Sequence, residues 1–342
     1  DRSNARLLRE KNGRRGLTAM QSTTGNKTLL VVYVNSLDSS PSYDFETVKN
    51  DILGTSGDTA NIITQYDACS AGQLKFIPAE NAGEEVVEGA ANIMLQNNTI
   101  GVSRYTVEGL VNDYITTNGY HWKDDFDHLM YVLPAGCDWG GGVLAYAYVN
   151  AQVSVYNDRT ASFIATQVHE IGHNLHFAHS GKDGNKYKDH TCYMGNALDG
   201  SDDLNKNAPL SCFNALKSWY TGWYSEGHQE VTLEGWDGPL VGIDDYNNGF
   251  FNPNDDRVLL YIPHPGTETA DRYEDLWVMY NRAKGVNQGV TDGINKVVIV
   301  KGPLIEGVYK ESSQIAQLEP TDGENTFISA DHGYIGSRLI IQ

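Results

Sequence analysis

Apolar runs and amphipathic stretches alternate through the first half of the chain. The run at 28–35, TLLVVYVN, is rich in β-branched residues and ends in a polar one, which predicts a buried strand. The stretch at 43–54 repeats apolar residues at helical spacing and ends in glycine, which predicts a helix. The same patterns predict further strands at 73–79, 126–134 and 143–150, and helices at 103–119 and 162–175. This alternation predicts an α/β domain built on a mixed, twisted sheet.

The pattern changes after about residue 225. Four short β-like runs follow, separated by Gly, Pro, Asn and Asp, and no strong helical pattern appears among them. These runs lie at 230–236, 257–264, 276–283 and 296–302. We therefore expect three parts: a basic, flexible N-terminal segment at 1–27, the α/β domain at 28–225 and a β-rich C-terminal domain at 226–342.

Composition and charge narrow the class of protein. Of the 342 residues, 40% are hydrophobic, so the chain can bury a substantial core. The net charge of −19 would repel the phosphates of nucleic acid, which argues against that class of partner. No apolar run approaches the roughly 20 residues that a membrane helix needs, so no membrane partner is expected. Only the N-terminal segment is basic, which is typical of a flexible tail or of the remnant of a pro-segment.

Cysteines and glycosylation sequons bear on the compartment. Four cysteines are spread over the chain and none forms a C-x-x-C pair, so a thiolate zinc site is not expected. An even, sparse set is typical of two disulfides in a secreted protein. Two N-x-T sequons, at Asn26 and Asn97, would permit glycosylation there. The sequence thus favours an extracellular location.

The clearest chemical signal is TQVHEIGHNLHFAHSG at 166–181, with four histidines and one glutamate within eleven residues. His169 and His173 stand four apart, so on a helix both rings lie on one face and can reach a single metal ion. Glu170 lies one position further round, where its carboxylate can act on a water bound to zinc without being a ligand. The plainer interpretation, histidines that decorate a helix face, does not account for so many groups in matching phase.

A third ligand must come from beyond the helix. If the helix continued, His176 would lie about 10.5 Å along the axis from His169, too far for three rings to share one ion. The chain must therefore turn back after His173. His179 then fits as the third ligand, and Asp183 is a weaker substitute.

The segment HEIGHNLHFAH resembles the extended zinc signature H-E-x-x-H-x-x-G-x-x-H of the metzincin metallopeptidases. The segments GCDWGG, YMG, CFNALKSWYTGWY and YNRAKGVNQG narrow the likeness to the gametolysin family. The resemblance covers about 28–310 and implies a metzincin-like, zinc-dependent endopeptidase that is secreted and acts on extracellular proteins. In algal members it implies action on cell-wall glycoproteins. It also implies that Met194 lies in the tight turn beneath the zinc.

The same interpretation extends to other parts of the α/β domain. The strand at 143–150 would line the cleft and offer its exposed edge to an extended substrate. Cys192 and Cys212 bracket the segment after Met194 and would brace it with a disulfide, which leaves Cys69 to pair with Cys137. Four cysteines allow three connectivities, so this pairing is one of three.

One position departs from the family pattern. The metzincin glycine, which lets the chain turn with a positive φ, is His176 in this sequence. Histidine tolerates the left-handed region better than most residues, so we expect the turn to survive with some strain.

Two further interpretations stay open at this point. The chain could be a non-catalytic extracellular binding protein with a structural metal site, in which His176 would serve as the fourth protein ligand. The acidic loops at 198–207 and 244–256 hold enough oxygen donors to suggest Ca²⁺. Neither loop has the EF-hand spacing, and solvated turns explain both as well.

Overall fold

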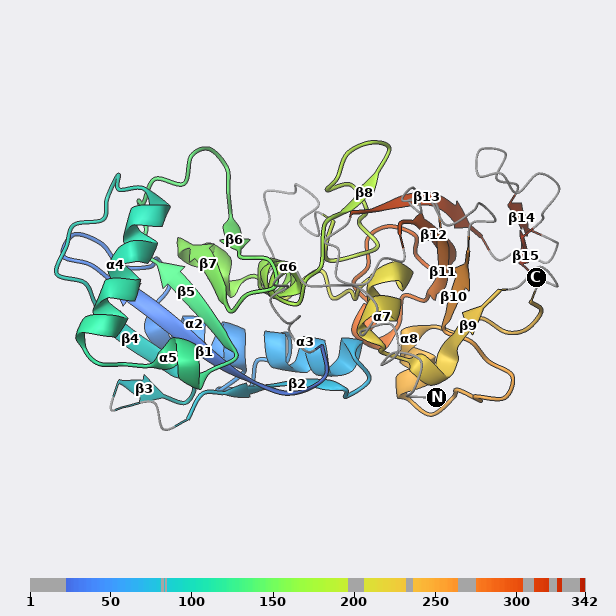
Figure 1. Ribbon diagram of the computed structural model, residues 1–342, viewed down its shortest axis with the longest axis horizontal. Helices are drawn as coiled ribbons and strands as arrows, with labels where there is room; N and C mark the ends of the chain where they lie inside the picture. The colour runs from blue at the N-terminus through green and yellow to red at the C-terminus, as the bar shows by residue number, and fades with distance from the viewer. Residues whose placement is uncertain are drawn as a thin grey trace, which may run out of the picture.

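The computed structural model describes residues 23–80, 83, 85–195, 206–231, 236–263, 275–303 and 311–319, together with the backbone of 325–327 and 339–341. Within these residues the chain forms two larger mixed sheets, a two-stranded ribbon and seven α-helices (Figure 1). The mixed α/β class predicted from the sequence is therefore confirmed. Among the described residues, every helix is too short or too polar to span a bilayer.

The first sheet has the strand order β3-β4-β1-β5-β7-β6, and β2 pairs with the first half of β1. Its central strands run parallel, whereas the edge strands β3 and β6 run antiparallel to their neighbours. Its strands are β1 (Gly25–Asn35), β2 (Leu74–Pro78), β3 (Val86–Val87), β4 (Ala90–Met94), β5 (His128–Leu133), β6 (Ala145–Ala147) and β7 (Val153–Asn157).

The apolar run of β1 is continuous because both faces of the strand are buried. Leu29 and Val31 pack in one buried cluster, whereas Leu30 and Val32 pack in another. Successive side chains of a strand point to opposite faces of the sheet, so helices must cover both faces. The first cluster contains residues of α2, α3 and α6, and the second contains residues of α4 and α5.

Local capping interactions set many of the helix ends. In α2, the Asp44 carboxylate accepts a hydrogen bond from the Thr47 N–H (2.9 Å), and Gly54 ends the helix with φ 70°. The full set is α2 (Phe45–Leu53), α3 (Ile62–Cys69), α4 (Arg104–Thr117), α5 (Trp122–Asp125), α6 (Ile164–Asn174), α7 (Ala215–Thr221) and α8 (Ile243–Asn247).

The second sheet has the strand order β8-β13-β12-β11-β10-β9 and contacts α7 on one face. Its strands are β8 (Ser180–Lys182), β9 (His228–Glu230), β10 (Leu259–Ile262), β11 (Leu276–Asn281), β12 (Lys296–Lys301) and β13 (Ser312–Leu318). The ribbon consists of β14 (Asn325–Phe327) and β15 (Leu339–Ile341).

The two sheets are not separate along the chain. Strand β8 precedes the boundary expected at residue 225, yet it pairs in parallel with β13, which follows that boundary. One buried cluster also joins Ile171 of α6 to Trp277 of β11. The division at 225 stays a prediction, and the second sheet takes strands from both sides of it.

Most predicted elements are confirmed within a few residues: β1, β2, β5, β10, β11 and β12 among the strands, and α2, α4 and α6 among the helices. The strand expected at 143–150 shortens to β6, and β7 lies between it and α6. The apolar pattern does not predict β7 because Ser154 interrupts it, although Ser154 is fully buried.

Two predicted segments lie partly outside the described residues. Of the expected flexible segment, residues 1–22 lie outside the described residues. Gly25–Lys27 open β1 and pair with β2, so β1 begins within the segment expected to be flexible. Most of the run expected at 230–236 also lies outside the described residues.

The predicted disulfides are wrong. Cys69 is bonded to Cys212, with 5.5 Å between their Cα atoms, and Cys137 and Cys192 are free thiols. Cys69 precedes β2 at the amino end of the sheet, whereas Cys137 follows β5 at the carboxyl end. The pairing positions of these strands along β1, Gly25 and Tyr33, are eight residues apart, or about 26 Å. A disulfide cannot cross that distance, and Cys212 is no longer available to Cys192.

Candidate metal centre

Helix α6 is anchored by buried amide side chains, so its histidines have a fixed place. Ten of its eleven residues are buried. Near its start, Gln167 Nε2 donates to the carbonyl oxygen of Asp51 in α2 (3.1 Å). At its end, Asn174 Nδ2 donates to the carbonyl oxygen of Tyr148, just beyond β6 (2.9 Å). The helix is therefore tied both to the layer beside it and to the edge of the first sheet.

The chain reverses at His176, which has a φ of 73°. The His176 N–H donates to the His173 carbonyl and the Phe177 N–H to the Gly172 carbonyl, both at 2.9 Å, and these bonds close the turn. The turn thus survives without glycine, as predicted. The His176 Nδ1 lies 3.1 Å from the Tyr220 hydroxyl, so this ring faces α7 rather than the other histidines.

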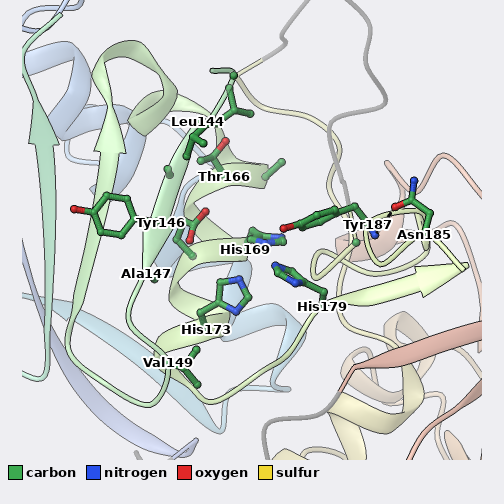
Figure 2. Close-up of a pocket in the computed structure, with 16 residues that line it drawn as sticks. Leu144, Tyr146, Ala147, Val149, Thr166, His169, His173, His179, Asn185 and Tyr187 are labelled. Atoms are coloured by element: carbon green, nitrogen blue, oxygen red, sulfur yellow. Dashed lines mark hydrogen bonds between the residues drawn. The ribbon is translucent and has the colours of Figure 1, made fainter. Parts of the chain in front are cut away.

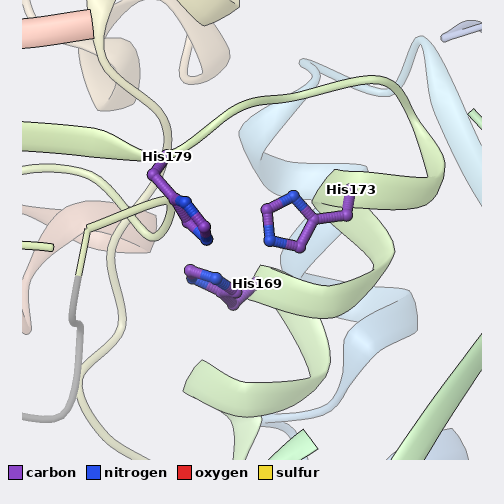
Figure 3. A group of neighbouring side chains, drawn as sticks. All are labelled: His169, His173 and His179. Atoms are coloured by element: carbon purple, nitrogen blue, oxygen red, sulfur yellow. The ribbon is translucent and has the colours of Figure 1, made fainter. Parts of the chain in front are cut away.

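The reversal brings His179 against His169 and His173 (Figure 3). Ring centroids are 4.9 Å apart for 169–173, 4.8 Å for 173–179 and 5.4 Å for 169–179. One nitrogen of each ring lies within 4.8 Å of the other two. Where the structure describes side chains, no other three His, Cys, Asp or Glu residues come together in this way. We call these three residues the histidine triad.

Two backbone carbonyls orient the rings that come from α6. The carbonyl oxygen of Tyr193 lies 2.7 Å from His169 Nδ1, and that of Phe177 lies 2.7 Å from His173 Nδ1. A carbonyl only accepts, so each Nδ1 must carry the proton. The Nε2 lone pairs are then available as ligands, which is the usual arrangement around metal-bound histidines. The donor set therefore fits a divalent metal such as zinc.

Burial keeps the triad uncharged. Burial lowers the pKa of His169, brings that of His173 to about 2 and brings that of His179 to about 3. The neighbouring histidines lower the last two pKa values further, because a positive charge on one ring opposes protonation of the next. Neutral imidazoles are the form that binds metals, so the triad favours a metal ion over protonation.

Glu170 places a buried carboxyl group beside the histidine triad. Its side chain is 7% exposed, and burial raises the pKa of its carboxyl group to about 8. It lines the same cavity as the histidine triad, and among the described residues it is the only carboxylate to do so. A carboxylate beside three neutral imidazoles can exchange a proton with a molecule bound in the cavity.

The cavity over the triad has a volume of about 760 Å³ (Figure 2). Edge strand β6 forms one wall, with Ala145 and Ala147, and Val143 and Leu144 precede them. Asn185 and Tyr187 stand on the opposite side, beyond His179. The cavity is therefore open above three imidazoles and is bounded by a sheet edge, as the cleft expected at 143–150 requires.

Met194 lies directly against α6. It is fully buried, and a Cβ atom at Gly172 would collide with its sulfur. Gly172 lies between Glu170 and His173, so the thioether packs on the turn of helix that carries the site. This close approach requires glycine at 172, a function of the signature that the spacing of histidines does not reveal.

Other candidate ligands do not join the triad. Asp183 lies 3.1 Å from Lys188 in an exposed ion pair. The acidic loop at 244–256 does not bring three carboxylates together, and the loop at 198–207 lies mostly outside the described residues. The calcium hypothesis therefore gains no support.

Three residues near the site do not stand out in the sequence. The ring of Tyr187 lies 4.4 Å from that of His179 and reaches into the cavity (Figure 2). Lys217 Nζ lies 3.4 Å from the His179 carbonyl oxygen, and Glu311 Oε1 lies 4.0 Å from His179 Nδ1. Tyr187 and Glu311 belong to none of the quoted motifs, and Lys217 lies in CFNALKSWYTGWY with no sign of its contacts. Only the folded chain brings Lys217 and Glu311 near residue 179.

Comparison with known proteins supplies a family. The model of a family described as gametolysin peptidase M11 matches residues 27–288, well over half of the chain. A search of curated proteins found no match.

Proposed function

The chain belongs to the gametolysin peptidase M11 family, which makes it a peptidase with protein substrates, and we propose that it is a secreted, zinc-dependent endopeptidase of metzincin type. Its substrates would be extracellular or cell-wall proteins, including glycoproteins. The observation that carries this proposal is the convergence of His169, His173 and His179 on one point beside Glu170.

The histidine triad would hold the zinc. Zinc held there would supply Lewis-acid polarisation of a carbonyl and of a water. Glu170 would take the proton of the attacking water on its carboxylate and give it to the leaving amine. Met194 would keep the floor of the site rigid from beneath Gly172.

The edge strand β6 would bind the substrate backbone. It pairs only with β7 in the described sheet, so its other edge is open to an extended peptide. Ala145 and Ala147 are small, which leaves room for a peptide between the strand and the triad.

Secretion is supported by two kinds of observation. The Cys69–Cys212 disulfide is typical of an oxidising compartment. The sequon residues Asn26 and Asn97 are both exposed, so each could carry a glycan.

The alternative, a binding protein with a structural metal, finds less support. A structural zinc site normally has four protein ligands. Among the described residues, no fourth His, Cys, Asp or Glu joins the triad, and His176 faces Tyr220.

Digestion of casein tests the proposal. We expect the wild-type protein to cleave casein, a chelator to abolish cleavage, and added zinc to restore it. Glu170→Gln should retain zinc but lose about 10²- to 10⁴-fold in kcat/KM, because the proton acceptor is gone. Zinc content of this variant is the control that separates loss of the base from loss of the metal. Undiminished cleavage by Glu170→Gln, or by the chelated protein, would refute the proposal.

A further inference from the structure

The backbone of His179 is hydrogen-bonded to the second sheet. It immediately precedes β8, and its carbonyl oxygen accepts a hydrogen bond from the Ser312 N–H of β13 (3.1 Å). Ser180, the next residue, pairs in register with Ser312. Figure 1 shows β8 leaving the region of α6 to run along the edge of the second sheet. The backbone of the third histidine is thus positioned by its hydrogen bond to the second sheet.

A buried lysine connects this strand pair to α7. Lys217 is 2% exposed, and its Nζ donates to the Ser312 hydroxyl (2.7 Å) and to the His179 carbonyl (3.4 Å). A buried ammonium group is costly unless its hydrogen-bond acceptors are fixed. Lys217 therefore holds two acceptors together, one beside the triad and one on β13.

The Ser312 hydroxyl is itself fixed by neighbours. It lies 2.9 Å from the Ser180 hydroxyl and accepts from Asn214 Nδ2 at 3.0 Å. Asn214 Nδ2 also donates to the Ser180 hydroxyl (2.8 Å). All of these side chains are buried, so removal of one partner leaves the others without compensation from water.

Among the described residues, the side chain of His179 has no backbone acceptor like those of the α6 histidines. Its Nδ1 lies 4.0 Å from Glu311 Oε1, on the residue that leads into β13. At that distance the carboxylate attracts the ring without fixing its direction. The placement of His179 therefore depends on its backbone more than the placement of the other two.

We propose that Lys217, acting through Ser312 and the His179 carbonyl, is a positioning residue that sets the third histidine of the triad. The proposal rests on the function proposed above, because it assumes that the triad holds a metal. It also makes β13 a part of the metal centre, although the family match ends at residue 288, before β12 and β13.

Zinc affinity of the full-length chain tests this role. Lys217→Met keeps the length of the buried side chain and removes its donors. We expect zinc affinity, measured by competition with a chromophoric chelator, to fall about 10- to 100-fold, the cost typical of removing a group that orients a ligand. The visible spectrum of the Co²⁺-loaded protein should change as well, because His179 would no longer complete the same coordination geometry.

A matched control separates this role from the general cost of removing a buried lysine. Lys49, on α2, is 3% exposed and pairs with Glu46 and Glu88 rather than with the triad. Lys49→Met should keep wild-type zinc affinity and the wild-type Co²⁺ spectrum. If Lys217→Met does not fold, Ser312→Ala provides the same test, because it removes the hydroxyl but keeps the backbone bond to His179.

The outcomes are distinguishable. Weaker zinc binding and an altered Co²⁺ spectrum in Lys217→Met, but not in Lys49→Met, support the proposal. Wild-type affinity and spectrum in folded Lys217→Met overturn it and leave the peptidase assignment intact. Where Lys217→Met does not fold, the same two outcomes are read from Ser312→Ala. A wild-type chain that binds no zinc overturns both.

Discussion

Helix α6 and strand β8 place the three histidines by different means. On α6, the helical repeat sets His169 and His173 side by side, and nearby carbonyls fix their rings. At β8, His179 takes its position from Ser312 and Lys217, which are distant in the sequence. Local geometry thus places two histidines of the triad, and the second sheet places the third.

This difference has a consequence for substitutions in the second sheet. The α6 pair has its anchors in α2 and beside β6, so substitutions on β13 that leave the chain folded should not change its geometry. The placement of His179 should be sensitive to such substitutions, because its backbone is hydrogen-bonded to β13 within the second sheet.

The largest expected effect comes from removing single histidines. His173→Ala and His179→Ala should each lower zinc affinity by more than about 100-fold, because both delete a ligand rather than a group that orients one. His173→Ala should be the worse, since it breaks the preformed helical pair, whereas His179→Ala leaves that pair intact. Competition with a chelator measures both affinities. Equal losses would show that the helical pair and His179 are equally preformed.

A smaller effect is expected from acid, through one buried histidine in each sheet. Burial lowers the pKa of His128, on β5, and of His228, on β9, to about 4 each. A depressed pKa means that the folded state prefers the neutral ring. This preference adds stability above pH 6.5 that is lost as the pH falls toward 4. For His128, which is fully buried, the loss is up to about 3 kcal/mol in the free energy of unfolding.

Replacing each ring by an apolar one sharpens the comparison. In urea unfolding of the metal-free protein between pH 7 and pH 4, His128→Leu should lose less stability on acidification than wild type. His228→Leu should show the same trend to a smaller degree, since its ring is only partly buried. Because one core joins both sheets, each variant should unfold in a single transition. Two transitions, one altered by each substitution, would show that the sheets unfold separately.

How much of this could be predicted from the sequence depends on the range of the interactions. The helices α2, α4 and α6 follow from periodicity, and the spacing from His169 to His179 predicts the turn at His176 because bond lengths to one ion are short. These features depend on residues within about two turns of a helix.

The features that could not be predicted are long-range. Cys69 meets Cys212 because α3 packs beside the segment before α7, which no spacing reveals. The sequence predicts no element at Lys217, and only the folded chain shows that this lysine is buried beside the paired strands β8 and β13. The boundary at 225 was expected from a change of pattern, which carries no information about which strands pair.

The coordination of zinc in the loaded protein tests the central claim most directly. Anomalous diffraction at the zinc edge locates the ion and its ligands together. We predict one ion bonded to nitrogen atoms of His169, His173 and His179 at about 2.0–2.1 Å, with no fourth side chain. An ion that leaves His179 unbound, or one closed by a fourth protein ligand, would contradict the account.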